Sequence, residues 1–462
     1  MEQQNTPILK LKEKIGYGLG DTASNLYFKF FELFLVYYYT DIFGLNPAAM
    51  GTMFLVANLW DAVNDPMMGA IADRTNTSKG KYRPYLLWFA IPYGFLGWLI
   101  FANPSFLTDD ATKLIYAYAT FILFKMVYTA INVPYSAMMG VISANPDDRA
   151  ELGRFRFLGA FGGGFLISLA VLPLVKFFGD GNEVKGFQYT MACFGILSVI
   201  CFYICYKMTQ ERVRPQKESA SVSIWDDFGF LLKNVPWIIM FIAGILTLTN
   251  VVLRGSVTIH YFKYYLGFGD EKVFLWMDKT TLFLTVGTLA FIIGCYLTKT
   301  VLKHFTKKNS LIVLTTINSL FIFYFFFIPA EAVTQLFIIN ILANIVAGPT
   351  PAIVWALYTD VADYGEWKFG RRATGLVFSA AQFAQKMGIT IAGAASGYLL
   401  TYFGYVANQE QSSEALMGIR IMFCILPGIL ALANGIILLW FPLTEKQTQK
   451  IQADLHLSRS SN

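Results

Sequence analysis

The sequence is poor in the residues that metal centres, disulfide frameworks and catalytic sites need. It has three histidines and five cysteines in 462 residues, and charged residues make up 14% of the chain. The histidines, His260, His304 and His456, are too scattered for a metal cluster. The chain also contains no G-x-x-x-x-G-K-[ST] loop and no nucleophile elbow. We therefore expect neither an enzyme, nor nucleotide-driven transport, nor a cofactor.

What the sequence has instead is long apolar stretches. Hydrophobic residues make up 55% of the chain and aromatic residues 16%, which is outside the range of soluble proteins. Stretches of about 20 apolar residues, each able to cross roughly 30 Å of hydrocarbon, recur along almost the whole chain. We predict an all-α membrane protein with about 12 transmembrane helices. Their predicted spans are 15–43, 49–72, 83–103, 111–142, 153–178, 188–208, 236–266, 274–301, 310–329, 333–362, 373–404 and 415–441.

The first residues and the positions of the cysteines are also informative. The first seven residues show no signal-peptide pattern, and the apolar stretch after them is too long for a signal-peptide core. All the cysteines fall within predicted helices, so a disulfide framework is not expected.

Positive charges fall in alternate loops between the predicted spans. The formal net charge of +6 is therefore the mark of a membrane protein rather than of a nucleic-acid-binding one. Loops rich in Lys and Arg lie on the cytoplasmic side, so both termini are expected in the cytoplasm. The basic loops contain Arg74, Lys79, Lys81 and Arg83; Arg149, Arg154 and Arg156; Lys207, Arg212, Arg214, Lys217 and Lys233; Lys299, Lys303, Lys307 and Lys308; and Lys368, Arg371 and Arg372.

A polar segment near the middle of the chain predicts two six-helix halves. We place a cytoplasmic linker at 209–235, between an N-terminal bundle at 1–208 and a C-terminal bundle at 236–462 with a short tail. The loop at 147–156 and the loop six helices later at 363–372 both carry acidic residues, then a glycine, then basic residues. Two parallel six-helix halves with substrate bound between them are the major facilitator arrangement.

The loop at 69–84 supports that arrangement. It reads Gly-Ala-Ile-Ala-Asp-Arg-Thr-Asn-Thr-Ser-Lys-Gly-Lys-Tyr-Arg-Pro and resembles the major facilitator signature G-x-x-x-D-R…G-[RK]-x-[RK]-P. We expect Asp73 to pair with basic groups or a helix end at a cytoplasmic gate. The alternative is an ordinary basic loop.

Two aspartates one helical turn apart interrupt the second apolar span. Asp61 and Asp65 share one helix face, with Asn64 beside them. A carboxylate near the bilayer centre costs roughly 2.5–3.5 kcal/mol on insertion scales. Two such carboxylates do not both stay ionised without a cation or a proton between them. The pair is therefore a candidate cation-coupling site, and the alternative is an acidic pair held by an intramembrane lysine.

Several motifs together resemble the glycoside–pentoside–hexuronide:cation symporters, the sugar-transporter family that includes melibiose permease. They run in order through nearly the whole chain at 14–21, 39–44, 60–69, 128–135, 360–368 and 385–388. The resemblance implies a major facilitator fold, a bacterial inner-membrane location and symport of a sugar with Na⁺ or H⁺.

The resemblance implies a cation site made of Asp61, Asn64, Asp65 and Thr129. Carboxylate and hydroxyl oxygens suit Na⁺, which Asp61 and Asp65 would then ligate, and a protonatable carboxylate suits H⁺. Lys125, where melibiose permease has a small residue, lies one turn before Thr129. Its ammonium group is within reach of the acidic pair, so it would weaken Na⁺ binding, favour proton coupling, or leave an uncoupled carrier.

The sugar site implied by the resemblance matches Asn25, Asn132 and Arg156. Melibiose permease has carboxylates at the first two positions and a tryptophan where this chain has Ser136. The amides still bind hydroxyl groups but lose charge-assisted hydrogen bonds. The alternative for both is an interhelical hydrogen bond.

Other intramembrane residues complete the expected site. Tyr128, Tyr135 and Trp355 are candidates for stacking on a sugar, with ordinary packing as the alternative. Lys386 matches the family's intramembrane lysine and would link the sugar and cation sites.

The remaining charges are assigned to gates or to mutual neutralisation. We expect Asp360 and Asp363 to form gate salt bridges with Arg149, Arg154, Arg371 or Arg372. Lys29 and Glu32, at i and i+3, are expected to pair. Arg254 and Lys263 lack an obvious partner, and Asp278 is one option.

The predicted function is uptake of a glycoside, pentoside or hexuronide by cation symport with alternating access. A sugar and the lipid bilayer are the expected partners, with no nucleic acid and no obligate protein. Two alternatives stay open at this point. One is a major facilitator carrier of a lysolipid or another amphipathic solute, and the other is a sugar sensor that does not transport.

Overall fold

The chain is almost entirely helical in the computed structural model, which describes residues 9–143, 145–213, 229, 231–269, 271–370 and 374–460. It divides into two compact units. Unit 1 comprises residues 1–218 and 270–282, and unit 2 comprises residues 219–269 and 283–462. The boundary at 218/219 falls inside the segment predicted to be a linker.

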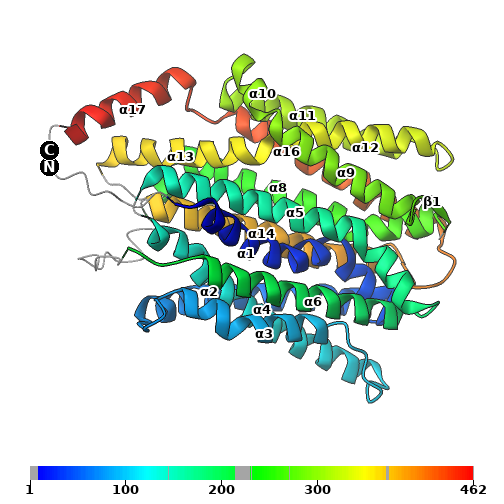
Figure 1. Ribbon diagram of the computed structural model, residues 1–462. Helices are drawn as coiled ribbons and strands as arrows, with labels where there is room; N and C mark the ends of the chain where they lie inside the picture. Colours follow the sequence, from blue (N-terminus) through cyan, green and yellow to red (C-terminus); the bar gives the residue numbers. More distant parts are fainter. Residues whose placement is uncertain are drawn as a thin grey trace. The chain divides into compact units, whose positions relative to one another are not determined.

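Unit 1 is a helical bundle whose helices run side by side (Figure 1). The first transmembrane stretch is α1 continued by two π-helical turns, η1 and η2, and five long helices follow. The bounds are α1 Leu11–Phe30, η1 Phe31–Leu35, η2 Tyr38–Ile42, α2 Pro47–Arg74, α3 Arg83–Leu99, α4 Asp110–Ile142, α5 Pro146–Gly179 and α6 Glu183–Met208. The antiparallel hairpin β1 Lys272–Phe274 and β2 Met277–Asp278, far away in the sequence, also belongs to this unit.

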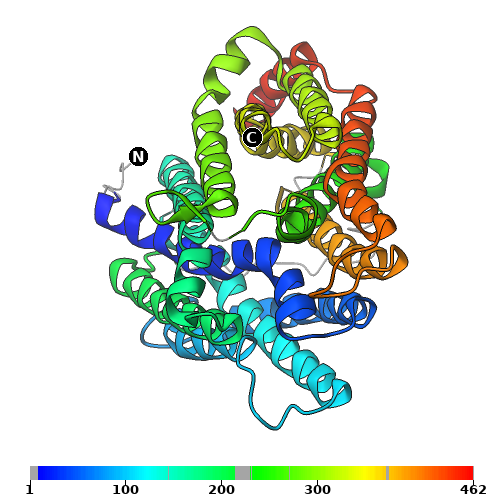
Figure 2. The same ribbon diagram turned by 90° about the vertical axis from the view of Figure 1, so that its right-hand side faces the viewer.

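Unit 2 is a second bundle, which Figure 2 shows end-on. Short π or 3₁₀ turns continue α8 and α11 and join α15 to α16. The bounds are α8 Val235–His260, η3 Tyr261–Tyr265, α9 Lys279–Tyr296, α10 Thr298–His304, α11 Lys307–Tyr324, η4 Phe325–Phe327, α12 Val333–Ala347, α13 Thr350–Phe369, α14 Thr374–Tyr402, α15 Ser413–Arg420, η5 Ile421–Ile425, α16 Leu426–Leu439 and α17 Glu445–Ser460.

Each of the twelve predicted spans overlaps a helix or a continuous run of helices, so the predicted all-α fold is confirmed. Three details were wrong. The span at 274–301 is shorter, because the β hairpin precedes α9 and a turn separates α9 from α10. The span at 333–362 is two helices, α12 and α13, because Pro349 has no N–H group to continue the helix. The predicted loop at 147–156 lies in the first turns of α5.

Local sequence explains where many of these helices begin. Side-chain oxygens of Asn46, Asp109, Asn182 and Asn234 accept hydrogen bonds from backbone N–H groups in the first turns of α2, α4, α6 and α8. Prolines at the first or second position of α2 and α8 add to this signal. At the other end of a helix, Gly370 ends α13 with φ of +68°, a conformation that glycine adopts without strain.

Helices α1 and α5 of unit 1 approach each other closely where two glycines face each other. A Cβ atom on Gly159 would lie 2.0 Å from the carbonyl oxygen of Gly18. The Thr22 hydroxyl donates a 3.0 Å hydrogen bond to the Gly159 carbonyl across the same contact. Small residues allow this approach of two backbones, which is the usual way membrane helices pack. This contact fixes α1 and α5, the helices that carry the sugar-site candidates Asn25 and Arg156.

Unit 2 has an apolar core between α8, α11, α13, α14 and α16. It includes Met240, Ile353, Tyr358, Val361 and Ala381, none of which exposes more than 1% of its surface. The C-terminal helix α17 adds Ile451 and Leu455 to the same cluster. A hydrogen bond of 3.0 Å from Trp367 to Asp454 joins α17 to the end of α13.

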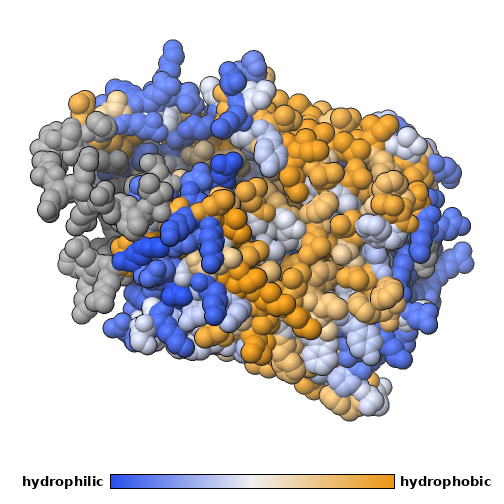
Figure 3. Space-filling model, in the orientation of Figure 1, coloured by the Kyte–Doolittle hydropathy of each residue, from blue (hydrophilic) through white to orange (hydrophobic). Residues whose placement is uncertain are grey.

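The surface has the polarity of a membrane protein. On the face shown in Figure 3, hydrophobic side chains gather along the middle of the helices and hydrophilic ones lie towards their ends. Among the described residues, eight helical stretches are long and apolar enough to cross a bilayer. Exposed apolar residues such as Phe177, Phe327 and Tyr402 would face lipid.

We predict that Gly159→Ala destabilises the protein, because the added methyl group would overlap the α1 backbone. Overpacking of this kind costs about 1–3 kcal/mol. Gly162→Ala in the same helix is the matched control, since no atom lies within 4 Å of the Cβ position there. Thermal unfolding of the detergent-solubilised protein measures both. Equal melting temperatures for the two variants would contradict the proposed packing.

Candidate functional site

The acidic pair of α2 faces α4, and Lys125 of α4 forms an ion pair with it. The Lys125 Nζ atom donates to Asp61 Oδ2 at 2.6 Å. Asp61 is 3% exposed, and its second oxygen, Oδ1, is buried without a hydrogen-bond partner among the described residues. The Tyr128 ring lies 6.0 Å from the same ammonium group. The expected contact between the Lys125 ammonium group and the acidic pair is therefore present in the structure.

The second carboxylate is held by the predicted threonine. The Thr129 hydroxyl donates to Asp65 Oδ1 at 2.8 Å, and Thr129 is buried. The Nδ2 atom of Asn64, between the two aspartates, is buried, and no residue in the described part of the chain accepts a hydrogen bond from it. The predicted cation-site residues thus lie together at the α2–α4 contact. Among the contacts described here, Lys125 pairs with Asp61 and Thr129 holds Asp65.

Asn25 and Asn132, predicted to bind sugar, make hydrogen bonds within unit 1. Asn25 Nδ2 donates to the Asp21 carbonyl at 2.9 Å. Asn132 Nδ2 donates to the Tyr128 carbonyl at 3.0 Å, and its Oδ1 accepts from the Ser24 hydroxyl at 2.6 Å. Both side chains are partly exposed. Each amide therefore keeps hydrogen-bonding capacity beyond the contacts described here.

Arg156 pairs with a carboxylate that the sequence analysis did not single out. Its Nε atom donates to Asp21 Oδ2 at 2.5 Å. The Tyr135 hydroxyl lies 3.2 Å from the same oxygen and 2.6 Å from the Tyr17 carbonyl. The Arg156 guanidinium lies 5.2 Å from the Tyr135 ring centroid. Asp21 is one turn before Asn25 on α1, and that spacing was the signal that would have found it.

The three aromatic candidates differ in exposure. Tyr135 is 0% exposed and supports the Asp21–Arg156 pair in this conformation instead of presenting a face to a sugar. Tyr128 is partly exposed and lies on α4 between Lys125 and Asn132. Trp355 of unit 2 stacks on Phe378 with ring centroids 5.7 Å apart.

Lys386, the predicted link to the cation site, lies on α14 in unit 2 and is partly buried. Its role, like those of the other site residues, stays a prediction.

The signature loop is held by a residue that the sequence placed in the linker. Glu211 accepts three backbone hydrogen bonds of 2.7 Å, from Lys81, Tyr82 and Arg83. Asp73 pairs with Lys81 at 3.4 Å and accepts a 2.7 Å hydrogen bond from the Tyr82 hydroxyl. Burial and that hydrogen bond raise the pKa of Tyr82. Asp73 therefore pairs with a basic group, as predicted, but one from its own loop.

No local pattern marked Glu211, because its contacts span about 130 residues of sequence. The next residue, Arg212, donates to Glu13 of α1 at 2.6 Å.

The predicted gate partners of Asp360 were wrong. Asp360 is buried and pairs with Lys307 of α11 inside unit 2. The Arg149 Nε atom donates to the Ser143 carbonyl at 2.9 Å, inside unit 1. Arg154 pairs with Glu151 at 3.6 Å. Asp363 lies on α13, whereas Arg371 and Arg372 lie outside the described residues.

The other intramembrane charges are mostly neutralised. Lys29 pairs with Glu32 at 2.6 Å, as predicted. Lys263 donates to the Asn408 side chain at 2.8 Å. Asp278 pairs with Lys176 of α5, so it is not the partner of Arg254 or Lys263. It also caps the start of α9 by accepting from the Thr281 N–H group.

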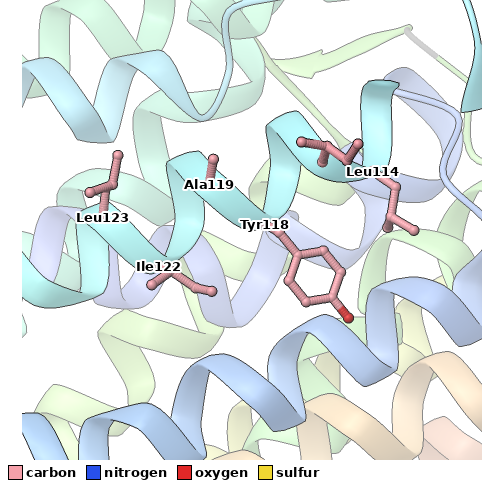
Figure 4. A pocket seen from close by; sticks show the side chains of 6 residues that line it. Leu114, Tyr118, Ala119, Ile122 and Leu123 are labelled. Carbon is pink, nitrogen blue, oxygen red and sulfur yellow. The ribbon is translucent and has the colours of Figure 1, made fainter. Parts of the chain in front are cut away.

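A shallow groove of about 660 Å³ lies along α4. Leu114, Tyr118, Ile122 and Leu123 line it from that one helix (Figure 4). The lining is almost entirely apolar, so it lacks the polar groups that a sugar needs. We interpret it as part of the lipid-facing surface.

A family model described as "MFS/sugar transport protein" matches residues 16–445. YagG of Escherichia coli K12, which its name assigns provisionally to glycoside/cation symport, is 38% identical over 98% of this chain and 96% of its own length. The chain belongs to the glycoside–pentoside–hexuronide:cation symporter family.

Other members support the same function. The isoprimeverose transporter of Lactiplantibacillus pentosus is 32% identical over 96% of this chain and 91% of its own. The glucuronide carrier protein homolog of Escherichia coli K12 is 30% identical over 96% and 94%. As a member of this family, the protein is a multi-pass, cation-coupled sugar symporter and not an enzyme. The lysolipid carrier and the non-transporting sensor are therefore set aside.

Solved structures show the same fold. A point mutant of the nucleoside transporter NupG has a TM-score of 0.64 at 16% identity, covering 93% of this chain and 99% of that one. A bacterial homologue of the human lysosomal transporter Spinster has a TM-score of 0.58 at 13% identity, covering 93% and 94%. The symporter has the major facilitator fold.

We predict that Glu211→Ala loosens the signature loop, because three backbone N–H groups lose a charged acceptor. Charge-assisted hydrogen bonds contribute about 1.5–3 kcal/mol each in general. Since these are partly exposed, we expect tryptic cleavage after Lys79 and Lys81 to accelerate about tenfold. Glu151→Ala, which removes a carboxylate from α5, is the control. If both variants are cleaved at the wild-type rate, Glu211 does not anchor the loop.

Proposed function

We propose that this symporter imports a neutral glycoside together with one proton. The observation that carries the proposal is the ion pair of Asp61 with Lys125 in the predicted cation site. A tethered ammonium group contacts one carboxylate, and a hydroxyl donor contacts the other. A metal cation needs several oxygen ligands at once, and a carboxylate oxygen that already accepts a hydrogen bond is a poor ligand. A proton needs only one lone pair.

The ion pair also bears on the stoichiometry. Because Lys125 already offsets Asp61, the uptake of one proton by the other carboxylate is the proposed stoichiometry. Asp65 is the proposed proton carrier, because Asp61 is already paired with Lys125. Bound sugar then strengthens proton binding by the same factor by which the proton strengthens sugar binding, as linkage requires. One proton moving through 100 mV supplies about 2.3 kcal/mol, or somewhat under two decades of accumulation.

The Asp21–Arg156 pair supports a neutral substrate. Arg156 is, with Lys386, one of the two positively charged residues of the predicted sugar site, and Asp21 offsets it at 2.5 Å. The predicted polar partners Asn25 and Asn132 carry no charge. A sugar carboxylate would therefore compete with Asp21 for the guanidinium group, whereas hydroxyl groups need only the amides and the arginine edges.

The setting proposed for this transport is a bacterial inner membrane with both termini in the cytoplasm. It is supported by the basic residues at one end of unit 1, where Glu13, Glu211 and the loop at 75–82 also meet. A related protein is named an inner membrane symporter.

The ion specificity is tested by uptake into proteoliposomes under an imposed pH gradient or an imposed Na⁺ gradient. Wild type is expected to accumulate sugar with the pH gradient alone. Lys125→Ala removes the ammonium group from Asp61 and is expected to make uptake at least about tenfold dependent on Na⁺. Lys113→Ala on the same helix is the control. Na⁺-driven uptake by wild type that Lys125→Ala leaves unchanged would exclude the proposal.

The proton carrier is tested by Asp65→Asn in the same vesicles. The amide mimics a protonated carboxylate, so sugar exchange should continue while accumulation driven by the pH gradient is lost. Asp61→Asn should abolish both, because it leaves Lys125 without its partner in the membrane. Accumulation that persists in Asp65→Asn would assign the proton elsewhere.

The substrate class is tested by Asp21→Asn. The change frees Arg156, so we expect the ratio of uronide to neutral glycoside uptake to rise about tenfold. Asp110→Asn, at the exposed start of α4, is the control. A ratio that stays constant while both sugars are still carried would show that Asp21 does not set this preference.

A further inference from the structure

Unit 2 contains two arginines without an acidic partner. Arg254 lies on α8 and Arg420 at the end of α15, and neither forms an ion pair with any described residue. The Nε and Nη2 atoms of Arg254 are buried without a hydrogen-bond partner among the described residues, as is the hydroxyl of Tyr261. This differs from Lys29 and Lys176, whose charges are neutralised by a neighbouring carboxylate.

The Arg254 guanidinium packs against two aromatic rings. Its Cζ atom lies 4.7 Å from the Phe325 ring centroid and 4.5 Å from that of Phe423, and the two centroids are 5.8 Å apart. The rings therefore lie on neighbouring sides of the group and not on its two opposite faces. The Nε–H and Nη2–H bonds share one edge of the guanidinium plane, and such an edge matches two oxygens of an oxyanion.

Arg420 adds a second positive charge to the same aromatic cluster. Its Cζ atom lies 4.7 Å from the Tyr265 centroid and 4.4 Å from the Phe326 centroid, and one nitrogen donates to the Phe326 carbonyl at 2.6 Å. Tyr261 stacks on Phe423 with centroids 4.2 Å apart. Within the described part of the chain, the cluster therefore combines two cations and three unpaired donor atoms with no anionic acceptor.

Burial of such a cluster calls for an anion. Contacts with aromatic rings offset only part of the desolvation of a guanidinium group. Arg254 lies inside the apolar stretch Val235–Tyr265, where a charge without a counter-ion is costly. Tyr324 and Phe327, which flank Phe325 and Phe326 in the sequence, are 42% and 72% exposed and would contact acyl chains.

We propose that Arg254, with Tyr261 and Arg420, binds the phosphate oxygens of an anionic phospholipid. The guanidinium edge donates to two phosphate oxygens, the tyrosine hydroxyl donates to a third, and Arg420 contributes charge. Basic pockets between membrane helices are suited to lipid headgroups for the same reason. The site is separate from the residues assigned to sugar and cation, so it does not depend on the proposed substrate or coupling ion.

The test uses the full-length protein, purified and stripped of lipid in a neutral detergent. Its melting temperature is measured while phosphatidylglycerol, phosphatidylcholine, inorganic phosphate or, at equal ionic strength, sodium chloride is added. Wild type should be stabilised by phosphatidylglycerol at low concentration. Arg254→Gln should raise the half-saturating lipid concentration about tenfold, and Arg254→Lys nearly as much, because an ammonium group lacks the two-donor edge.

Two further variants complete the design. Tyr261→Phe removes one donor with little change in volume, and it decides the question if the arginine variants do not fold. Arg154→Gln, an exposed arginine of unit 1, is the control and should bind like wild type. Equal stabilisation by inorganic phosphate would support the oxyanion site with free phosphate as its source. Lipid stabilisation that is the same in wild type, Arg254→Gln and Tyr261→Phe would overturn the proposal.

Discussion

The ion pair between Asp61 and Lys125 is the interaction on which the account of this symporter depends. It places a fixed cation in the predicted cation site. In the proposed mechanism, Asp65, held by Thr129, is the group whose charge changes during transport. Coupling then depends on the ion that neutralises Asp65.

Neutralisation inside each unit is a wider principle of this structure. Arg156 pairs with Asp21, Lys29 with Glu32, and Lys176 with Asp278 in unit 1. Lys307 pairs with Asp360 in unit 2. Charges that face hydrocarbon or a narrow pathway are expensive unless they are paired. The two arginines of the Arg254 cluster depart from this principle, which is why they point to a ligand from outside the chain.

The fold and the cation site followed from the sequence for different reasons. Helix spans follow from local composition, so all of them were found. Their errors fall at Pro349, at the β hairpin and at the start of α5, where local composition does not decide the boundary. Asp61 and Asp65 lie one turn apart on one helix, so their proximity needed no tertiary structure. Thr129 and Lys125 came from the family motif and from charge counting.

The partners that were missed depend on contacts between distant segments. Asp21 lies in the family motif at 14–21, but its pairing with Arg156 spans 135 residues. Glu211 sits in a polar stretch that gives no sign of the loop it holds. Asp278 was one option as a partner for Arg254 and Lys263, whereas its segment folds with unit 1 and Asp278 pairs with Lys176. Composition does not encode such assignments.

The most direct measurement of the central claim is the proton flux that sugar itself causes. Proteoliposomes loaded with a pH-sensitive dye, at clamped membrane potential and without Na⁺, are given an external neutral glycoside that the protein carries. The account predicts that the lumen becomes more acidic, with about one proton entering per sugar, and that added Na⁺ does not change this ratio. Sugar entry without proton movement, or entry that begins only when Na⁺ is added, would contradict it.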